Sequence, residues 1–367
     1  MRTLLGRWQT WAGFGVAALL LFVAAPAMLS TFRLGLFGQF LCYAIVAVGI
    51  GLVWGRGGML VLGQGVFFGL GGYMMGMHLK IADAQIAGSD VPDFMSISGR
   101  NELPGYWVPF TSPLVTLLAI LFIPAGIAAA LGFGVFKRRV KGAYFAILSQ
   151  ALAAAMAILL VGQTGLGGSN GLNGFQTFFG FRLSDPVNKQ MLYFIAAGTL
   201  LAVVAIVRQL MYSRYGELLV AVRDSEERVR FLGYDPANIK VFAYAVAALF
   251  ASIAGALFAP IVGFITPSQV GILPSIAFLI GVAIGGRTTL LGPVLGAIGV
   301  AWAQSLFSER FPSAWTYGQG LLFIIVIGFF PAGLAGLAVF LRRRKRAADP
   351  PAADTERVEA KLSEGAS

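Results

Sequence analysis

Long apolar runs follow one another along most of the chain, separated by short polar stretches. The hydrocarbon core of a bilayer is about 30 Å thick and needs roughly 20 apolar residues per helix. The pattern therefore predicts an all-α polytopic membrane protein with about ten transmembrane helices, some of them broken by glycine. The eighth run is short, and predicts either a half-helix or a hairpin with the ninth. The runs are residues 12–30, 34–54, 58–79, 113–135, 143–161, 190–210, 241–262, 273–286, 290–307 and 315–335.

The composition agrees with this pattern and removes several classes of function. Of the 367 residues, 57% are hydrophobic and only 12% are charged, about half the charged share of a soluble domain. So few charges cannot cover a water-facing surface, which excludes a soluble enzyme. A single His and a single Cys leave too few ligands for the usual transition-metal sites. No P-loop motif occurs, and the apolar runs contain no Asp or Glu, so we expect no bound cofactor, no ATP site and no proton relay in this chain.

The basic residues are unevenly distributed between alternate loops. If the N-terminus lies inside, 21 of the 27 Lys and Arg residues lie on the inner side and 6 on the outer side. Positive charge is retained on the cytoplasmic side of membrane proteins, so the pattern predicts that both termini are inside. The net charge of +11 then follows from topology, and no nucleic-acid partner is expected.

The polar stretches divide the chain into a membrane domain and its appendages. Residues 1–340 are predicted to form the transmembrane domain, with an external insert at 80–112 and a glycine-rich external segment at 162–189. Residues 341–367 begin with the basic run 342–346 and continue as a polar stretch. This composition predicts a basic and then disordered inner tail beside anionic lipid.

The inner loop 211–240 carries helix-capping signals. Asp224 followed by Glu227 three residues later predicts an N-cap, and Gly233 suits the position just after a helix, so residues 225–232 should be helical. Glu226 and Arg230 are four residues apart and are expected to pair. A helix this short is marginal in water. We therefore expect it to dock on another protein, on the membrane surface or on this chain.

The third apolar run is interrupted by glycines around one amide side chain. Gln64 lies between Gly63 and Gly65, with Phe67 and Phe68 a turn further on. One interpretation is that the amide and exposed backbone groups bind a small neutral polar solute between aromatic walls. The other is that the glycines serve close helix packing. A second glycine-rich stretch at 285–299 could mark inverted halves or a parallel repeat, and both arrangements stay open.

Four segments together resemble a known family, and they are residues 62–68, 167–172, 221–234 and 282–287. The first contains Leu62-Gly63-Gln64-Gly65, the second ends Asn170-Gly171-Leu172, and the last ends Gly285-Gly286-Arg287. In this order and spacing they resemble the LivM-like permeases of ATP-binding cassette (ABC) importers of the branched-chain amino acid type. The chain is most similar to the urea-importer branch of that family.

The resemblance implies a role and a set of partners. It implies a permease subunit that forms half of a translocation pathway in the bacterial plasma membrane. The partners would be a second permease subunit, two ABC ATPase subunits that use the ATP, and an extracytoplasmic solute-binding protein. The expected substrate is urea or a short-chain amide, with branched-chain amino acids or a passive small-solute channel as alternatives. The predicted pathway residues are Gly63, Gln64, Gly65, Phe67, Phe68 and Asn170, and the predicted coupling residues are Arg223, Asp224, Glu226, Glu227, Arg228 and Gly233.

Overall fold

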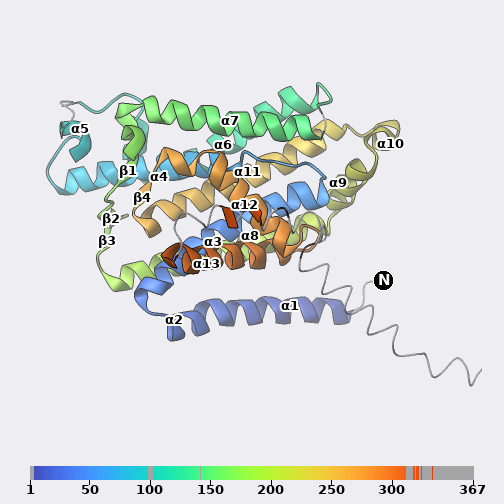
Figure 1. The fold of residues 1–367 in the computed structure, drawn as a ribbon, viewed down its shortest axis with the longest axis horizontal. Helices are drawn as coiled ribbons and strands as arrows, with labels where there is room; N and C mark the ends of the chain where they lie inside the picture. The colour runs from blue at the N-terminus through green and yellow to red at the C-terminus, as the bar shows by residue number, and fades with distance from the viewer. Residues whose placement is uncertain are drawn as a thin grey trace, which may run out of the picture.

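The computed structural model describes residues 4–97, 102–140 and 142–310, with a few isolated residues beyond 316. Most of the regular structure in this part of the chain is helical (Figure 1). The longer helices are α1 Leu4–Leu19, α3 Thr31–Ile50, α4 Gln64–Ile86, α6 Pro113–Phe136, α7 Ala143–Gly162, α8 Pro186–Met211, α9 Arg214–Asp224, α11 Pro236–Val262, α12 Ile272–Gly285 and α13 Gly292–Arg310. The short helices are α2 Ala25–Met28, α5 Asp93–Ile97 and α10 Glu226–Phe231.

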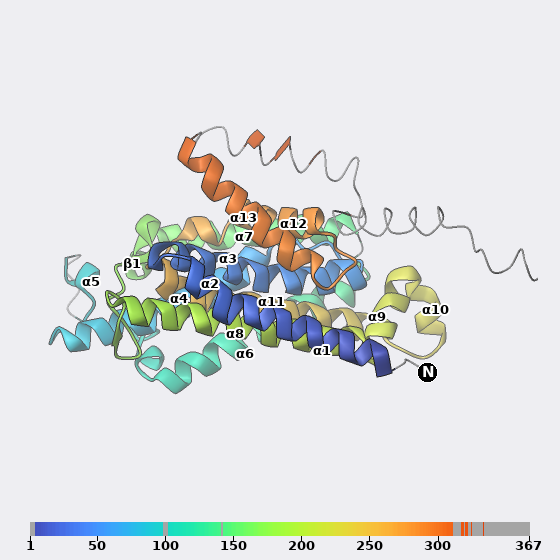
Figure 2. The same ribbon diagram turned by 90° about the horizontal axis from the view of Figure 1, so that it is seen from below.

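The long helices run roughly alongside one another, and the short elements gather at the two ends of the bundle. Figures 1 and 2 both show α9 and α10 at the end where α1 begins, and α5 with strand β1 at the opposite end. The inner loop 211–240 and the insert 80–112 are therefore at opposite ends, as the charge pattern requires. Which end faces the cytosol stays a prediction, and the tail 341–367 lies outside the described residues.

Six segments of the described chain are long and apolar enough to cross a membrane. The predicted fold class, a multi-pass helical membrane protein, is therefore supported. The predicted count of about ten spans is not confirmed. The first apolar run is a shorter apolar helical stretch, Ala12–Met28, and the tenth run, 315–335, lies outside the described residues. The six segments are Thr31–Arg56, Pro113–Phe136, Ala143–Gly162, Pro186–Met211, Pro236–Val262 and Pro267–Gly285.

Two expected boundaries differ in the structure. Helix α4 starts at Gln64 rather than residue 58, because the glycine-rich stretch before it is not helical, and it continues to Ile86 into the expected insert. The eighth and ninth runs become α12 and α13, which pack as a hairpin. Their backbones meet so closely that a Cβ on Gly285 would lie 1.8 Å from the carbonyl oxygen of Gly292.

The glycine-rich external segment is tied to the bundle instead of forming a free loop. Strand β1, Leu172–Asn173, pairs antiparallel with β4, Phe264–Ile265, which follows α11. Strands β2, Thr177–Phe178, and β3, Phe181–Arg182, form a small hairpin next to it. Gly171 has φ of +65°, and a Cβ there would lie 2.1 Å from the Ile265 carbonyl oxygen. This position therefore requires glycine for two independent reasons.

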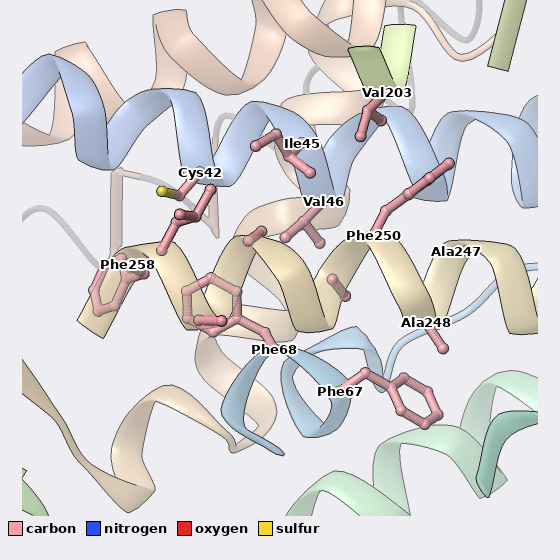
Figure 3. Packing of buried hydrophobic residues seen from close by; sticks show 14 of the residues in the cluster. Cys42, Ile45, Val46, Phe67, Phe68, Val203, Ala247, Ala248, Phe250 and Phe258 are labelled. Carbon is pink, nitrogen blue, oxygen red and sulfur yellow. The ribbon is translucent and has the colours of Figure 1, made fainter. Parts of the chain in front are cut away.

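The core lies where α3, α4 and α11 cross. Figure 3 shows Ile45 and Val46 of α3, Phe68 of α4 and Phe258 of α11 packed together, and each is almost fully buried. Small residues bring the backbones into contact, since a Cβ on Gly255 of α11 would lie 1.8 Å from the Phe68 carbonyl oxygen. Helices in lipid associate through this kind of close packing rather than through hydrophobic burial alone.

Candidate functional site

The start of α4 is held by hydroxyl groups from two other helices. The Oγ atom of Ser149 in α7 accepts a hydrogen bond from the Leu62 N–H at 3.0 Å. The Oγ atom of Ser275 in α12 accepts one from the Gly65 N–H, also at 3.0 Å. The Ser149 hydroxyl donates in turn to the Ala146 carbonyl of α7, and the Ser275 hydroxyl donates to the carbonyl of Gly271, the N-cap of α12. The two serines thus satisfy backbone donors that a helix start leaves free, and sequence reasoning missed both because each is a lone serine in an apolar run.

The Gln64 side chain lies between these supports without a hydrogen-bond partner. The residue is 1% exposed. Of the six buried side-chain nitrogen and oxygen atoms that lack a partner in the described part of the chain, two are its Nε2 and Oε1. A buried polar group without a partner costs about 1–3 kcal/mol. One buried amide therefore retains a donor and an acceptor that could serve a ligand.

The flanking glycines are used for packing. A Cβ on Gly63 would lie 2.2 Å from the Ser149 carbonyl oxygen, and one on Gly65 would lie 2.6 Å from the Ser275 hydroxyl. Both positions are buried. The structure thus supports the packing interpretation for the glycines, and a solute-binding role of the amide stays a prediction.

The two phenylalanines belong to the helix core. Phe67 is 0% exposed and makes an edge contact with Tyr244, with ring centroids 5.6 Å apart. Phe68 makes an edge contact with Phe258 and a tilted contact with Phe278, with ring centroids 5.1 and 5.4 Å apart. They form packed walls on two sides of α4 rather than the lining of an open space.

Asn170 forms no hydrogen bond with the Gln64 amide. It is exposed on the outer segment and lines a cavity of about 550 Å³ together with Lys80 of α4. Gln64 and Lys80 are 16 residues apart on α4, or about 24 Å along the helix axis. Gln64 is not among the residues that line this cavity, so the structure does not place Asn170 and the Gln64 amide at one cavity.

The inner segment 211–240 is more helical than predicted, and its cap is displaced by one residue. Residues Arg214–Asp224 form α9, and α10 spans Glu226–Phe231. The N-cap is Ser225, whose hydroxyl accepts a hydrogen bond from the Arg228 N–H, whereas Asp224 ends α9. The prediction of Asp224 as cap is wrong because α9 continues through that residue. Gly233 does follow α10, with φ of +88°.

Two polar contacts join this segment to the membrane helices. The Arg223 Nη1 atom donates to the Gly55 carbonyl oxygen at 3.0 Å, at the corner that precedes α4. Glu226 forms an ion pair with Lys240 of α11, and the two side chains are only 18% and 9% exposed. The Lys240 ammonium also lies 5.8 Å from the Phe136 ring centroid. Glu226 therefore pairs with Lys240 instead of the expected Arg230.

The outer face of α10 is exposed. Glu227 and Arg228 face solvent. The residues that follow are apolar and open, with Phe231 91% and Leu232 75% exposed. A cluster of exposed large apolar side chains beside charges is typical of a protein contact surface.

Two Gly-Arg pairs, Gly55-Arg56 before α4 and Gly286-Arg287 after α12, lie against each other. The Arg287 guanidinium stacks 4.8 Å from the Trp54 ring centroid. A Cβ on Gly55 would lie 1.8 Å from the Arg287 carbonyl oxygen. Since Arg223 holds the same Gly55, the α9–α10 segment, the corner before α4 and the corner after α12 form one connected junction.

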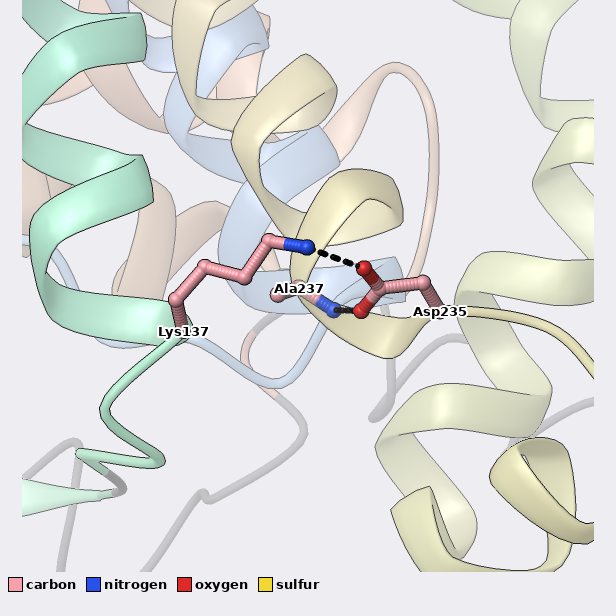
Figure 4. Close-up of polar contacts among 3 residues, drawn as sticks. All are labelled: Lys137, Asp235 and Ala237. Atoms are coloured by element: carbon pink, nitrogen blue, oxygen red, sulfur yellow. Dashed lines mark hydrogen bonds and ion pairs between the residues drawn. The ribbon is translucent and has the colours of Figure 1, made fainter.

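A further ion pair joins helices at the same end of the bundle (Figure 4). Lys137, just after α6, lies 2.5 Å from Asp235, which caps α11 by accepting the Ala237 N–H at 3.0 Å. The hydrogen bond from Lys137 lowers the pKa of Asp235. A lowered folded-state pKa stabilises the fold above the unfolded value and ceases to do so as the pH falls through the folded value. The contact therefore persists at neutral pH.

A bundle of long apolar helices, with a broken helix at an unpartnered amide and a protruding polar segment at one end, defines a multi-pass membrane permease. Residues 32–330 match the family described as branched-chain amino acid transport system / permease component, and the chain belongs to that family. It is thus a permease component of a transport system, and its family is a transport family rather than a class of enzymes. The LivM-like resemblance is confirmed, and the urea-importer branch stays a prediction.

Curated relatives agree with this assignment. The chain is 27% identical over 344 residues to the high-affinity branched-chain amino acid transport system permease protein LivM of Escherichia coli strain K12, covering 88% of this chain and 74% of the relative. It is 26% identical to the protein of the same name from Salmonella typhimurium, with the same coverage. No solved structure matches the chain significantly.

Proposed function

We propose that this chain is one of two permease subunits of an ATP-driven importer in the bacterial plasma membrane. Its partners are a second permease subunit, two ABC ATPase subunits and an extracytoplasmic solute-binding protein. The chain forms half of the pathway and binds no cofactor itself, because the ATP is hydrolysed by the ATPase subunits. The family membership and the exposed surface of α10 support this proposal.

The observation that carries the proposal is the junction between α9 and the corner before α4. In this mechanism an ATPase subunit docks on α10 through Phe231 and Leu232, with Glu227 and Arg228 at the edge of the contact. Movement of α10 is transmitted to α11 through the Glu226–Lys240 ion pair. It is transmitted through Arg223 to Gly55, and Gly55 lies nine residues before Gln64. A buried side-chain amide then lies on an element that the ATPases can displace.

Two substrates remain in competition, and each has an observation in its favour. The unpartnered Nε2 and Oε1 of Gln64 match the carbonyl and amide groups of urea or a short-chain amide. The relatives are branched-chain amino acid permeases by name, which favours a zwitterion, and a zwitterion would require a charged group or a helix-terminus dipole. Our first choice is urea or a short amide, and the runner-up is a branched-chain amino acid.

Replacing Gln64 by Met tests whether its amide binds the solute or has a purely structural role. Met fills a similar volume and has no amide, so removing an unpartnered buried polar group should leave the stability unchanged or raise it by about 1 kcal/mol. Uptake of labelled urea by the complete complex in proteoliposomes should fall at least tenfold. The matched control is Gln39→Met, which removes an amide that hydrogen-bonds Tyr43 at 2.8 Å and should leave uptake nearly unchanged.

Uptake assays in the same proteoliposomes distinguish between the substrates and between active transport and a passive channel. ATP-dependent uptake of labelled leucine with none of urea would make the runner-up correct. Flux of either solute through this chain without ATPase subunits would indicate a passive channel and overturn the proposal. Unchanged uptake in the Gln64→Met complex would remove Gln64 from the pathway.

A further inference from the structure

A cavity opens at the end of the bundle opposite α10. It has a volume of about 690 Å³ and lies between the starts of α3 and α8, the end of α11 and the β2–β3 hairpin. Figure 1 places these element ends together on the side that carries β2 and β3. The site is separate from Gln64, and it contains no residue used in the proposed transport mechanism.

The wall of this cavity is apolar and its rim is basic. Leu192 and Tyr193 of α8 and Ile261 of α11 form part of the wall, while Arg182 and Lys189 are exposed at the rim. The lining residues of the described chain include these two bases and no carboxylate. The arrangement suits an amphiphile whose charged group is an anion.

Glycines on α3 keep the cavity open. Gly35 and Gly38 line it, and an added Cβ on Gly35 would meet nothing within 4 Å. A side chain could therefore fit at Gly35 but would occupy the empty space. Both glycines lie in the first two turns of α3, which begins at Thr31. In a spanning helix these turns lie at the boundary between headgroups and hydrocarbon.

The basic rim is held in place by a partly buried carboxylate. Asp83 of α4 accepts hydrogen bonds from the backbone N–H groups of Gln176 and Thr177 at 2.8 and 2.9 Å, and from the Thr177 hydroxyl at 2.6 Å. Thr177 pairs with Arg182 in the β2–β3 hairpin. The hairpin that presents Arg182 is thereby fixed to α4, so the base is positioned at the cavity rather than on a free loop.

We propose that this cavity binds one anionic phospholipid. Its phosphate lies between Arg182 and Lys189, where charge-assisted hydrogen bonds from both bases are available. One acyl chain lies along Ile261 and Val262, in the groove left by Gly35. The occupant is a membrane lipid rather than a soluble phosphate, because apolar residues line the cavity beside the two bases.

The test measures lipid retention by the full-length protein after purification. The protein is reconstituted in nanodiscs with equal phosphatidylglycerol and phosphatidylethanolamine, extracted in mild detergent, and its retained lipid is measured by mass spectrometry. We expect at least tenfold more phosphatidylglycerol than phosphatidylethanolamine. The double variant Arg182→Gln, Lys189→Gln should lose this preference, while the control Arg33→Gln, an exposed base near the start of α3, should keep it.

A second variant addresses the acyl chain independently of charge. Gly35→Leu starts its side chain at a Cβ position with nothing within 4 Å, and it should reduce phosphatidylglycerol retention at least fivefold while the melting temperature is maintained. Retention that is unchanged in both the double variant and Gly35→Leu overturns the proposal. The proposal would also be overturned if soluble glycerol phosphate raised the melting temperature of the wild-type protein as much as phosphatidylglycerol does. A phosphate site alone would then suffice.

Discussion

Replacing Gly255 by alanine is expected to destabilise the whole bundle, although alanine is the better helix former. Gly255 of α11 lies against α4, where an added Cβ would be 1.8 Å from the Phe68 carbonyl oxygen and 2.7 Å from its carbon. Backbone atoms cannot move aside as side chains do, so the two helices must separate. Overpacking of this kind typically costs about 1–3 kcal/mol, and we expect the upper end because both contacts are with backbone.

The measurement is thermal unfolding in detergent, followed by size-exclusion chromatography, with Gly126→Ala as the matched control. Gly126 is in α6, exposed, with nothing within 4 Å of an added Cβ, so alanine there should be neutral or should stabilise by up to about 1 kcal/mol. Gly71→Ala should resemble Gly255→Ala, since its Cβ would lie 1.9 Å from the Ser252 carbonyl oxygen. Equal melting temperatures for Gly255→Ala and Gly126→Ala would contradict the packing described here.

Breaking the Glu226–Lys240 ion pair is expected to uncouple uptake from ATP hydrolysis. Both side chains are largely buried, and removing one partner of a buried pair costs about 3–5 kcal/mol because the other charge is left uncompensated. In Glu226→Lys two ammonium groups would meet, so α10 should lose its fixed position on α11. We expect ATP-dependent uptake by the reconstituted complex to fall at least tenfold while ATP hydrolysis continues.

A charge exchange distinguishes coupling from general damage. The double variant Glu226→Lys, Lys240→Glu restores an opposite pair at the same place and should recover a large part of the uptake. Glu217→Lys introduces the same charge change at an exposed position of α9 and should behave as wild type. If Glu226→Lys transported normally, the role assigned to this ion pair would be refuted.

Hydropathy predicted the ends of most of the long helices to within a few residues. It failed at the start of α4, where the apolar run contains several glycines. Runs such as 113–135 and 241–262 correspond to α6 and α11 because a long apolar stretch in lipid must satisfy its backbone hydrogen bonds internally. The stretch 58–63 is also apolar, yet it is not helical. Its conformation depends on hydroxyl contacts from Ser149 and on the neighbouring corner at Arg287, which no local pattern reports.

The capping signals were informative but ambiguous by one residue. Asp224 and Ser225 are both good N-caps, so local sequence could not choose between them. The choice depends on α9, which buries Leu219 and Val222 and continues through Asp224. Likewise, Arg230 lies one turn from Glu226 along the chain, but Glu226 forms its ion pair with Lys240 of α11. The Lys240 side chain is the more buried partner, and only the tertiary structure brings it close.

By itself, the sequence determined the class of this protein: a charge-poor helical bundle for lipid, with its basic loops at one end and its broken helix at Gln64. These properties depend on composition and on neighbours along the chain. Only the tertiary structure decided that Gln64 is unpartnered, that Phe67 and Phe68 are core residues and that Asn170 lines a cavity with Lys80. Such facts depend on which distant backbones come within a few ångströms, and contacts between helices in lipid are set by shape and close packing rather than by hydrophobicity, which is nearly the same on every face.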